Sequence, residues 1–106
     1  MKDFPITRNM KSVKGTGNPV ANQYVTYAKP YVVFQSYDSI IAVVDKGQHT
    51  VYIGEDWHYS RTTDAYRNKF FDEMGLEELS STAKVNKALT DGYVVVGINT
   101  YSVTRL

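Results

Sequence analysis

Short apolar runs separated by turn residues dominate the first half of the chain. Residues 23–27 and 31–36 are rich in β-branched and aromatic residues, a composition typical of strands. Residues 39–44 are almost entirely apolar, which predicts a central strand covered on both faces. The turn Asp45-Lys46-Gly47 follows, and residues 50–54 resume as the antiparallel partner of that strand. The pattern predicts a meander of three or four strands.

The apolar spacing changes to that of a helix after residue 60. Either Ser60 or Thr62 can cap the helix, because a hydroxyl oxygen can accept from the first-turn amides that lack an intrahelical partner. Gly75 is placed to end it. The expected buried stripe consists of Tyr66, Phe70, Phe71 and Met74.

The last third of the chain predicts a second helix and a further strand. The helix runs from about residue 81 to residue 90, with Val85 and Leu89 on one side, and stops at Asp91-Gly92. Residues 93–98 form the next strand. Residues 99–106 either extend that strand or turn back as a short hairpin, and the pattern does not decide between the two.

The first twenty residues differ from the rest. They are polar, and Gly15, Gly17 and Pro19 stand close together, which predicts an irregular or mobile arm. Residues 21–106 are predicted to form a single domain. Because strands come first, then helices and then a strand, the expected class is α+β. The specific expectation is an antiparallel sheet of about four to five strands with two helices packed on one face.

Composition narrows the class of protein. A chain of 106 residues fits one domain, and the absence of cysteine excludes disulfides and thiolate catalysis. No apolar run is long enough to span a bilayer, and the N-terminus lacks the apolar segment of a secretory signal. We therefore expect a soluble protein of the cytoplasm that does not act at a membrane. The chain has nine tyrosines and four phenylalanines. Because tyrosine combines an apolar ring with a polar hydroxyl, this excess indicates surfaces of the domain that are partly buried and partly in contact with water or a partner.

The residues that could support catalysis have simpler interpretations. His49 and His58, with Glu55 and Asp56, make at most a partial metal site, so surface histidines are the better account. Ser60 stands two residues from His58 at a helix entry, a spacing that does not orient a base toward a nucleophile. Adjacent carboxylates point apart. We expect no enzyme, no metal and no cofactor.

The charges suggest two kinds of partner. Carboxylates beside exposed tyrosines can occupy a basic groove built for nucleic acid, whereas the alternative interpretation is a solvated helix end. The candidate partner-binding residues are Glu55, Asp56, Asp72, Glu73, Glu77 and Glu78. A basic arm could instead contact nucleic acid directly. The candidates for that role are Lys2, Arg8, Lys11, Lys14, Arg61 and Arg67.

Two segments carry a family resemblance. Residues 34–42 read FQSYDSIIA, and residues 57–63 read WHYSRTT, followed by Tyr66-Arg67 and Phe70-Phe71. Together with residues 17–24, they resemble small proteins of phages and plasmids of Gram-positive bacteria that carry a domain of unknown function. The hallmark resembles "FQSY-S-IA" followed by "W-YSRTT--Y---F". The resemblance implies a mobile-element accessory protein of the bacterial cytoplasm, and it supplies no catalytic residues.

These observations lead to two functional hypotheses. The first is a non-enzymatic mobile-element protein that binds and inhibits a host-defence component, most concretely an anti-CRISPR inhibitor of an RNA-guided nuclease. Its partner would be a host protein, the CRISPR effector nuclease in that case. The alternative is a nucleic-acid-binding accessory protein of a phage or plasmid, whose binding weakens steeply with salt.

Overall fold

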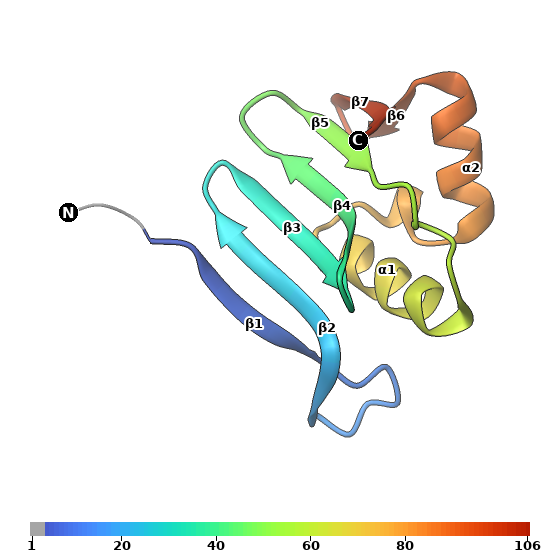
Figure 1. Ribbon diagram of the computed structural model, residues 1–106. Coiled ribbons are helices and arrows are strands. Elements are labelled where there is room, and N and C mark those ends of the chain that lie inside the picture. Colours follow the sequence, from blue (N-terminus) through green and yellow to red (C-terminus); the bar gives the residue numbers. More distant parts are fainter. Residues whose placement is uncertain (1–3) are drawn as a thin grey trace.

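The structure, a computed structural model that describes residues 4–106, is built on one seven-stranded mixed sheet (Figure 1). The strand order is β1-β2-β3-β4-β5-β7-β6. The strands are β1 (Ile6–Lys11), β2 (Pro19–Ala28), β3 (Tyr31–Ser36), β4 (Ser39–Asp45), β5 (Thr50–Ile53), β6 (Tyr93–Val96) and β7 (Asn99–Arg105). The helices are α1 (Arg61–Glu73), the short 3₁₀ helix η1 (Glu77–Leu79) and α2 (Thr82–Asp91).

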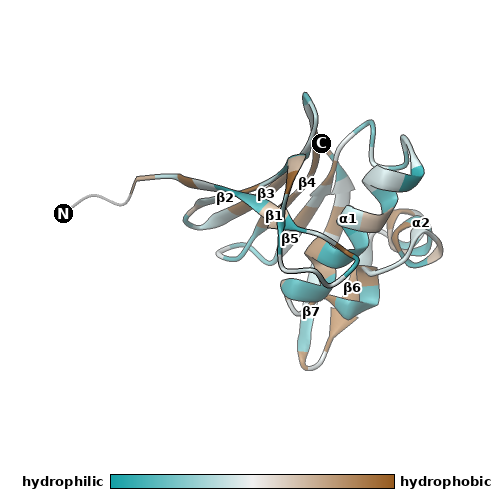
Figure 2. Ribbon diagram, turned by 90° about the horizontal axis from the view of Figure 1, so that it is seen from below, coloured by the Kyte–Doolittle hydropathy of each residue, from teal (hydrophilic) through white to brown (hydrophobic). Residues whose placement is uncertain are grey.

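Both α-helices lie on the same side of the sheet, as the view from below in Figure 2 shows. Alternate residues of the central strands point toward them, because successive side chains of a strand face opposite ways. Phe34 of β3 and Phe70 of α1 stack with ring centroids 5.6 Å apart. One buried cluster joins the sheet to the helices, and its fully enclosed members include Phe34, Ala42, Val51, Ile53, Phe71, Leu79 and Val85. The α+β class is therefore confirmed.

The sheet is larger than the sequence predicts. Seven strands replace the expected four to five, and one of the additional strands, β1, lies within the predicted arm. The expectation of an irregular segment is wrong there, because β1 pairs antiparallel with β2 along Ile6–Asn9. Only Met10 of β1 is buried, so the strand has no apolar alternation that a sequence pattern could reveal. Residues 1–3 of the predicted arm lie outside the described residues.

The sheet is mixed and not wholly antiparallel. Residues 99–106 turn back, which settles the open alternative in favour of a hairpin, and β7 pairs antiparallel with β6. On its other side β7 pairs parallel with β5, through Thr50–Ile53 and Ser102–Arg105. The two helices form the crossover between β5 and the final hairpin, which is the connection that parallel neighbours require.

Strand β4 is covered on one face, so the prediction of burial on both faces is wrong. Ala42 and Val44 are buried toward the helices, whereas Val43 is only half-buried on the opposite face. A β-branched residue is well suited to such a half-covered surface, and for this reason the apolar run resembled a fully buried strand.

The helix ends follow the predicted chemistry. Of the two possible caps, Ser60 is the one used: its side chain accepts from the Thr63 amide. Gly75 has φ +76°, and the Leu76 amide donates to the Phe71 carbonyl at 2.8 Å, the pattern of a glycine-terminated helix. Within residues 4–106, neither α1 nor α2 combines the length and the apolar character needed to cross a membrane.

Candidate binding cleft

A cleft of about 650 Å³ opens where the β3–β4 turn faces the start of α1. It brings together the two segments that carry the family resemblance, which are separated in the chain by the end of β4 and the whole of β5. Most of its lining side chains carry a hydroxyl or a carboxylate. They are Ser36, Tyr37, Asp38, Ser39, Ile41, Asp56, Tyr59, Ser60, Thr62 and Thr63. We call this site the hydroxyl cleft.

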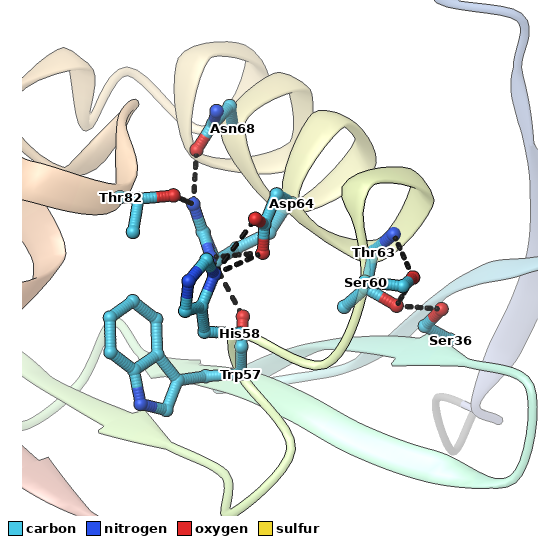
Figure 3. A network of polar contacts seen from close by, with 9 residues as sticks. Ser36, Trp57, His58, Ser60, Thr63, Asp64, Asn68 and Thr82 are labelled. Carbon is cyan, nitrogen blue, oxygen red and sulfur yellow. Dashed lines mark hydrogen bonds and ion pairs between the residues drawn. The ribbon is translucent and has the colours of Figure 1, made fainter.

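Three hydroxyls tie the floor of the hydroxyl cleft to the helix cap (Figure 3). The oxygen of Thr63 Oγ1 lies 3.1 Å from Ser36 Oγ and 3.2 Å from Ser60 Oγ. Ser60 Oγ also accepts from the Thr63 amide at 3.1 Å. Ser36 and Thr63 are buried, so this network joins β3 to the first turn of α1 and fixes the distance between the two walls.

The hydroxyl cleft carries negative charge. Ser39 Oγ donates to Asp56 Oδ2 at 2.7 Å, which holds one carboxylate in place on the wall. Asp38 supplies a second carboxylate from the β3–β4 turn. Among the described residues, none that lines the cleft is a lysine, arginine or histidine. An arrangement of two carboxylates among hydroxyls is complementary to a cationic group that also donates hydrogen bonds.

Two exposed tyrosines flank these carboxylates. Tyr59 is 75% exposed and Tyr37 is 50% exposed. Tyr37 has φ +53°, the left-handed region that disfavours a bulky side chain, and its amide donates to the Asn22 carbonyl at 2.7 Å. Packing does not require a tyrosine at this half-exposed position, whereas exposed tyrosines are common at protein interfaces.

A second polar cluster is centred on Arg67, and Figure 3 labels its members Trp57, Asp64, Asn68 and Thr82. The Arg67 side chain is fully buried. Nη1 donates to the Trp57 carbonyl at 2.7 Å and to Asp64 Oδ1 at 2.9 Å. Nη2 donates to Asn68 Oδ1 at 2.8 Å and to Thr82 Oγ1 at 2.7 Å. We call this arrangement the Arg67 cluster.

The Arg67 cluster joins three segments of the chain. The guanidinium carbon lies 5.2 Å from the centre of the Trp57 ring, a cation–π contact that secures the loop before α1. The bond to Thr82 secures the start of α2. Burial lowers the pKa of Arg67 below its ordinary value, and the neighbouring Asp64 opposes that effect. Because an arginine stays charged in proteins, the cluster is a buried, paired cation that organises the fold.

The predicted acidic residues fall into two separate groups. Glu55 and Asp56 lie in the loop before α1, and only Asp56 lines the hydroxyl cleft. Asp72 and Glu73 end α1, and Glu77 and Glu78 begin η1. The 13 residues of α1 place about 20 Å between the groups. The two groups therefore cannot act as one patch, and among the predicted acidic residues only Asp56 lines the hydroxyl cleft.

The predicted basic residues are also dispersed. Arg8 and Lys11 belong to β1, Lys14 lies in the following loop, and Arg61 is exposed at the start of α1. Lys2 lies outside the described residues. The assignment of Arg67 to nucleic acid is wrong, because all of its side chain is enclosed. Its side-chain partners are Asp64, Asn68 and Thr82, and the contact with Thr82 of α2 is the one that no local pattern could reveal.

The histidines and serines of this region have structural partners. His58 Nδ1 lies 2.8 Å from Asp64 Oδ2, so this histidine extends the Arg67 cluster and does not face the Ser60 hydroxyl. Within residues 4–106 no group of three or more histidine, aspartate or glutamate side chains is arranged to hold a metal ion. The geometry of this part of the chain supports recognition of a polar, cationic group by the hydroxyl cleft.

Sequence reasoning did not identify the hydroxyl cleft as a site. It treated the two resembling segments as core aromatics and a helix cap. The polar residues between those aromatics, Ser36–Ser39 and Tyr59–Thr63, are the ones that meet across the cleft. The sequence does show that both segments are rich in hydroxyl-bearing residues, which could have indicated a polar site. That the two segments meet in space depends on the β3–β4 turn folding toward α1.

Comparison with known proteins gives one result for this chain. No curated protein and no solved structure matches it. A family model matches residues 1–87, which include the hydroxyl cleft and the Arg67 cluster and end within α2. The match covers well over half of the 106 residues. The chain belongs to the family of unknown function DUF8033.

Proposed function

We propose that this protein is a non-enzymatic binding protein of a phage or plasmid that inhibits a component of bacterial host defence. The concrete target is an RNA-guided nuclease in the cytoplasm of the host. The observation that carries the proposal is the hydroxyl cleft, which Asp38 and Asp56 line together with two exposed tyrosines and with no basic side chain among the described lining residues.

The chemistry of such a cleft favours a basic protein surface as its partner. Carboxylates and hydroxyls accept hydrogen bonds from lysine and arginine side chains, and tyrosine rings cover the aliphatic parts of those side chains. RNA-guided nucleases hold nucleic acid in positively charged channels. A small protein whose acidic cleft docks against such a channel blocks nucleic acid by occupying its place, and charge complementarity at the cleft favours the correct partner.

The buried Arg67 cluster supports the same role because it makes the site rigid. It fixes the loop that carries Asp56 and Tyr59, so these side chains lose little conformational entropy when a partner binds. The resemblance of residues 34–42 and 57–71 to phage and plasmid proteins supports the cellular setting of the proposal.

An interference assay tests the proposal. Bacteria that carry an RNA-guided nuclease and a matching guide are challenged with a target plasmid, with and without expression of this chain. We expect transformation to be restored when the chain is expressed. Full interference in the presence of well-expressed chain, across the nuclease types tested, would overturn the proposal.

A direct measurement separates the alternative of nucleic-acid binding. Purified chain is titrated into labelled double-stranded and single-stranded DNA at low salt, where phosphate contacts are strongest. We expect no binding, because the cleft is acidic and Arg67 is enclosed. Tight binding that weakens steeply with added salt would favour the accessory-protein role and contradict inhibition by docking in a basic channel.

A further inference from the structure

The two edges of the sheet are built differently. Edge strand β1 carries Arg8 and Lys11, and its pairing with β2 is irregular between Asn9 and Lys11. Charged residues and bulges are the devices by which proteins prevent an edge from pairing with another strand. Edge strand β6 has the sequence Tyr-Val-Val-Val, with no charge, no proline and a regular register. One edge is therefore protected and the other is open.

The open edge exposes its backbone groups in a defined order. Val96 and Asn99 close a two-residue turn, and the hydrogen bonds of an antiparallel ladder alternate from there. The Gly92 carbonyl accepts from the Val103 amide at 3.0 Å, which places the even-numbered residues of this segment toward β7. The N–H and C=O groups of Tyr93 and Val95 therefore face away from β7, where the described residues supply no further strand.

Apolar side chains gather at this edge. Tyr93 and Val95 are each 51% exposed, and Ile98, at the tip of the β6–β7 turn, is 100% exposed. A fully exposed isoleucine at the tip of a hairpin is unfavourable in water, since its apolar surface has no cover. In an antiparallel pairing through β6, the turn of one copy lies beside the start of β6 in the other, where Ile98 and Tyr93 can cover each other.

The charged residues beside the β6 edge favour a second copy of this chain over a partner whose surface carries charges of one sign only. A groove of about 230 Å³ runs between α2 and β6, and its charged lining residues are Glu78, Lys84, Lys87 and Asp91. These two cations and two anions sum to zero, and Lys87 already pairs with Asp91 within the chain, so the surface beside the edge does not select a strongly charged partner. Across a two-fold axis, a contact of residue i with residue j of the other copy is repeated as a contact of j with i. Like charges therefore need not face each other in such a dimer.

We propose that the chain forms a symmetric dimer through antiparallel pairing of β6 with β6 of a second copy, which joins two seven-stranded sheets into one. The strand has only four residues, so the dimer is weak and its population depends on concentration. The pairing leaves the hydroxyl cleft free, because none of its lining residues belongs to β6, β7 or α2.

The test compares two lysine substitutions on the same face of the sheet. Val95→Lys places a charge on the open edge, and Thr100→Lys places the same charge directly across the ladder on β7. Mass is measured by sedimentation across a wide dilution series. We expect wild type and Thr100→Lys to form dimers at high concentration and Val95→Lys to remain monomeric. A monomeric wild type at every concentration, or equal loss of dimer in both variants, would overturn the proposal.

Hydrogen exchange tests the same pairing without a substitution. The amides of Val94 and Val96 face β7 and should be protected at all concentrations. The amides of Tyr93 and Val95 should gain protection of at least tenfold in concentrated protein compared with dilute protein. Equal exchange of these two amides at both concentrations, in a sample that sedimentation shows to be dimeric, would assign the dimer to another surface and overturn the proposal.

Discussion

The Arg67 cluster and the hydroxyl cleft lie on opposite sides of one loop, and they use polar side chains in opposite ways. In the Arg67 cluster each terminal nitrogen of the guanidinium donates two hydrogen bonds, and the side chain is sealed from water. In the hydroxyl cleft the carboxylate of Asp56 is held by Ser39, yet Tyr37 is half-exposed and Tyr59 lies largely in solvent. The terminal nitrogens of Arg67 find their partners within the described chain and only its Nε lacks one, whereas the hydroxyl cleft is open to a ligand.

This difference separates stability from binding within the eleven residues from Trp57 to Arg67. Trp57 and Arg67 belong to the closed cluster, and Tyr59 and Thr62 belong to the open cleft. Ser60 belongs to both functions, since it caps α1 and lines the cleft. Substitutions on the two sides should therefore divide into those that unfold the protein and those that leave it folded.

The largest effect is expected from Arg67→Ala. The substitution removes the cation from a buried pair and leaves Asp64 without its arginine partner, which typically costs about 3 to 5 kcal/mol of the free energy of unfolding. Urea denaturation measures the loss. The matched control is Arg61→Ala, at an exposed site on the same helix, which should change the free energy of unfolding by no more than about 0.5 kcal/mol. Similar losses in both variants would remove the distinction between the two regions.

An intermediate effect is expected from Ser60→Ala. Loss of the side chain that caps α1 should cost about 1 kcal/mol, because the Thr63 amide loses its acceptor. Thr62→Ala is the control, since Thr62 lines the same cleft but does not cap the helix. Thermal unfolding of both variants checks the order. A loss for Thr62→Ala as large as that for Ser60→Ala would show that the cleft wall itself carries stability.

The smallest effect on stability is expected from Tyr59→Ala. The ring is 75% exposed, so its removal should alter the free energy of unfolding by no more than about 0.5 kcal/mol. Chemical denaturation measures this change. If the variant instead lost several kcal/mol, Tyr59 would be a packing residue and the description of an open cleft would be wrong.

The sequence predicted those parts of the fold in which local chemistry decides the outcome. The strand expected over residues 31–36 coincides with β3, and Ser60 and Gly75 cap α1 as their side-chain and backbone preferences require. Strand β1 was missed because it is an exposed edge, held by its ladder with β2 and not by an apolar stripe. The parallel pairing of β5 with β7 was missed because it depends on where the helical crossover returns the chain.

The candidate site was less predictable than the fold, because both polar clusters depend on tertiary contacts. The side chain of Arg67 is enclosed by tertiary contacts, with Trp57 from the loop before α1 and with Thr82 from α2. The hydroxyl cleft joins Ser36 to Thr63 across 27 positions of sequence. The contact of Arg67 with Thr82 and the contact of Ser36 with Thr63 cannot be inferred from the spacing of residues along the chain. The residue types on each side are nevertheless evident in the sequence.

If the hydroxyl cleft binds the partner, the carboxylates of Asp38 and Asp56 contact that partner directly. The most direct measurement compares two double variants in their affinity for a guide-loaded RNA-guided nuclease that wild type binds. One variant, Asp38→Asn with Asp56→Asn, removes the charge of the cleft, and the other, Asp72→Asn with Glu73→Gln, removes the same charge at the far end of α1. We predict that the cleft variant binds at least about tenfold more weakly, a change of roughly 1.4 kcal/mol, and that the far variant binds like wild type. Unchanged affinity of the cleft variant, or a larger loss in the far variant, would contradict the account.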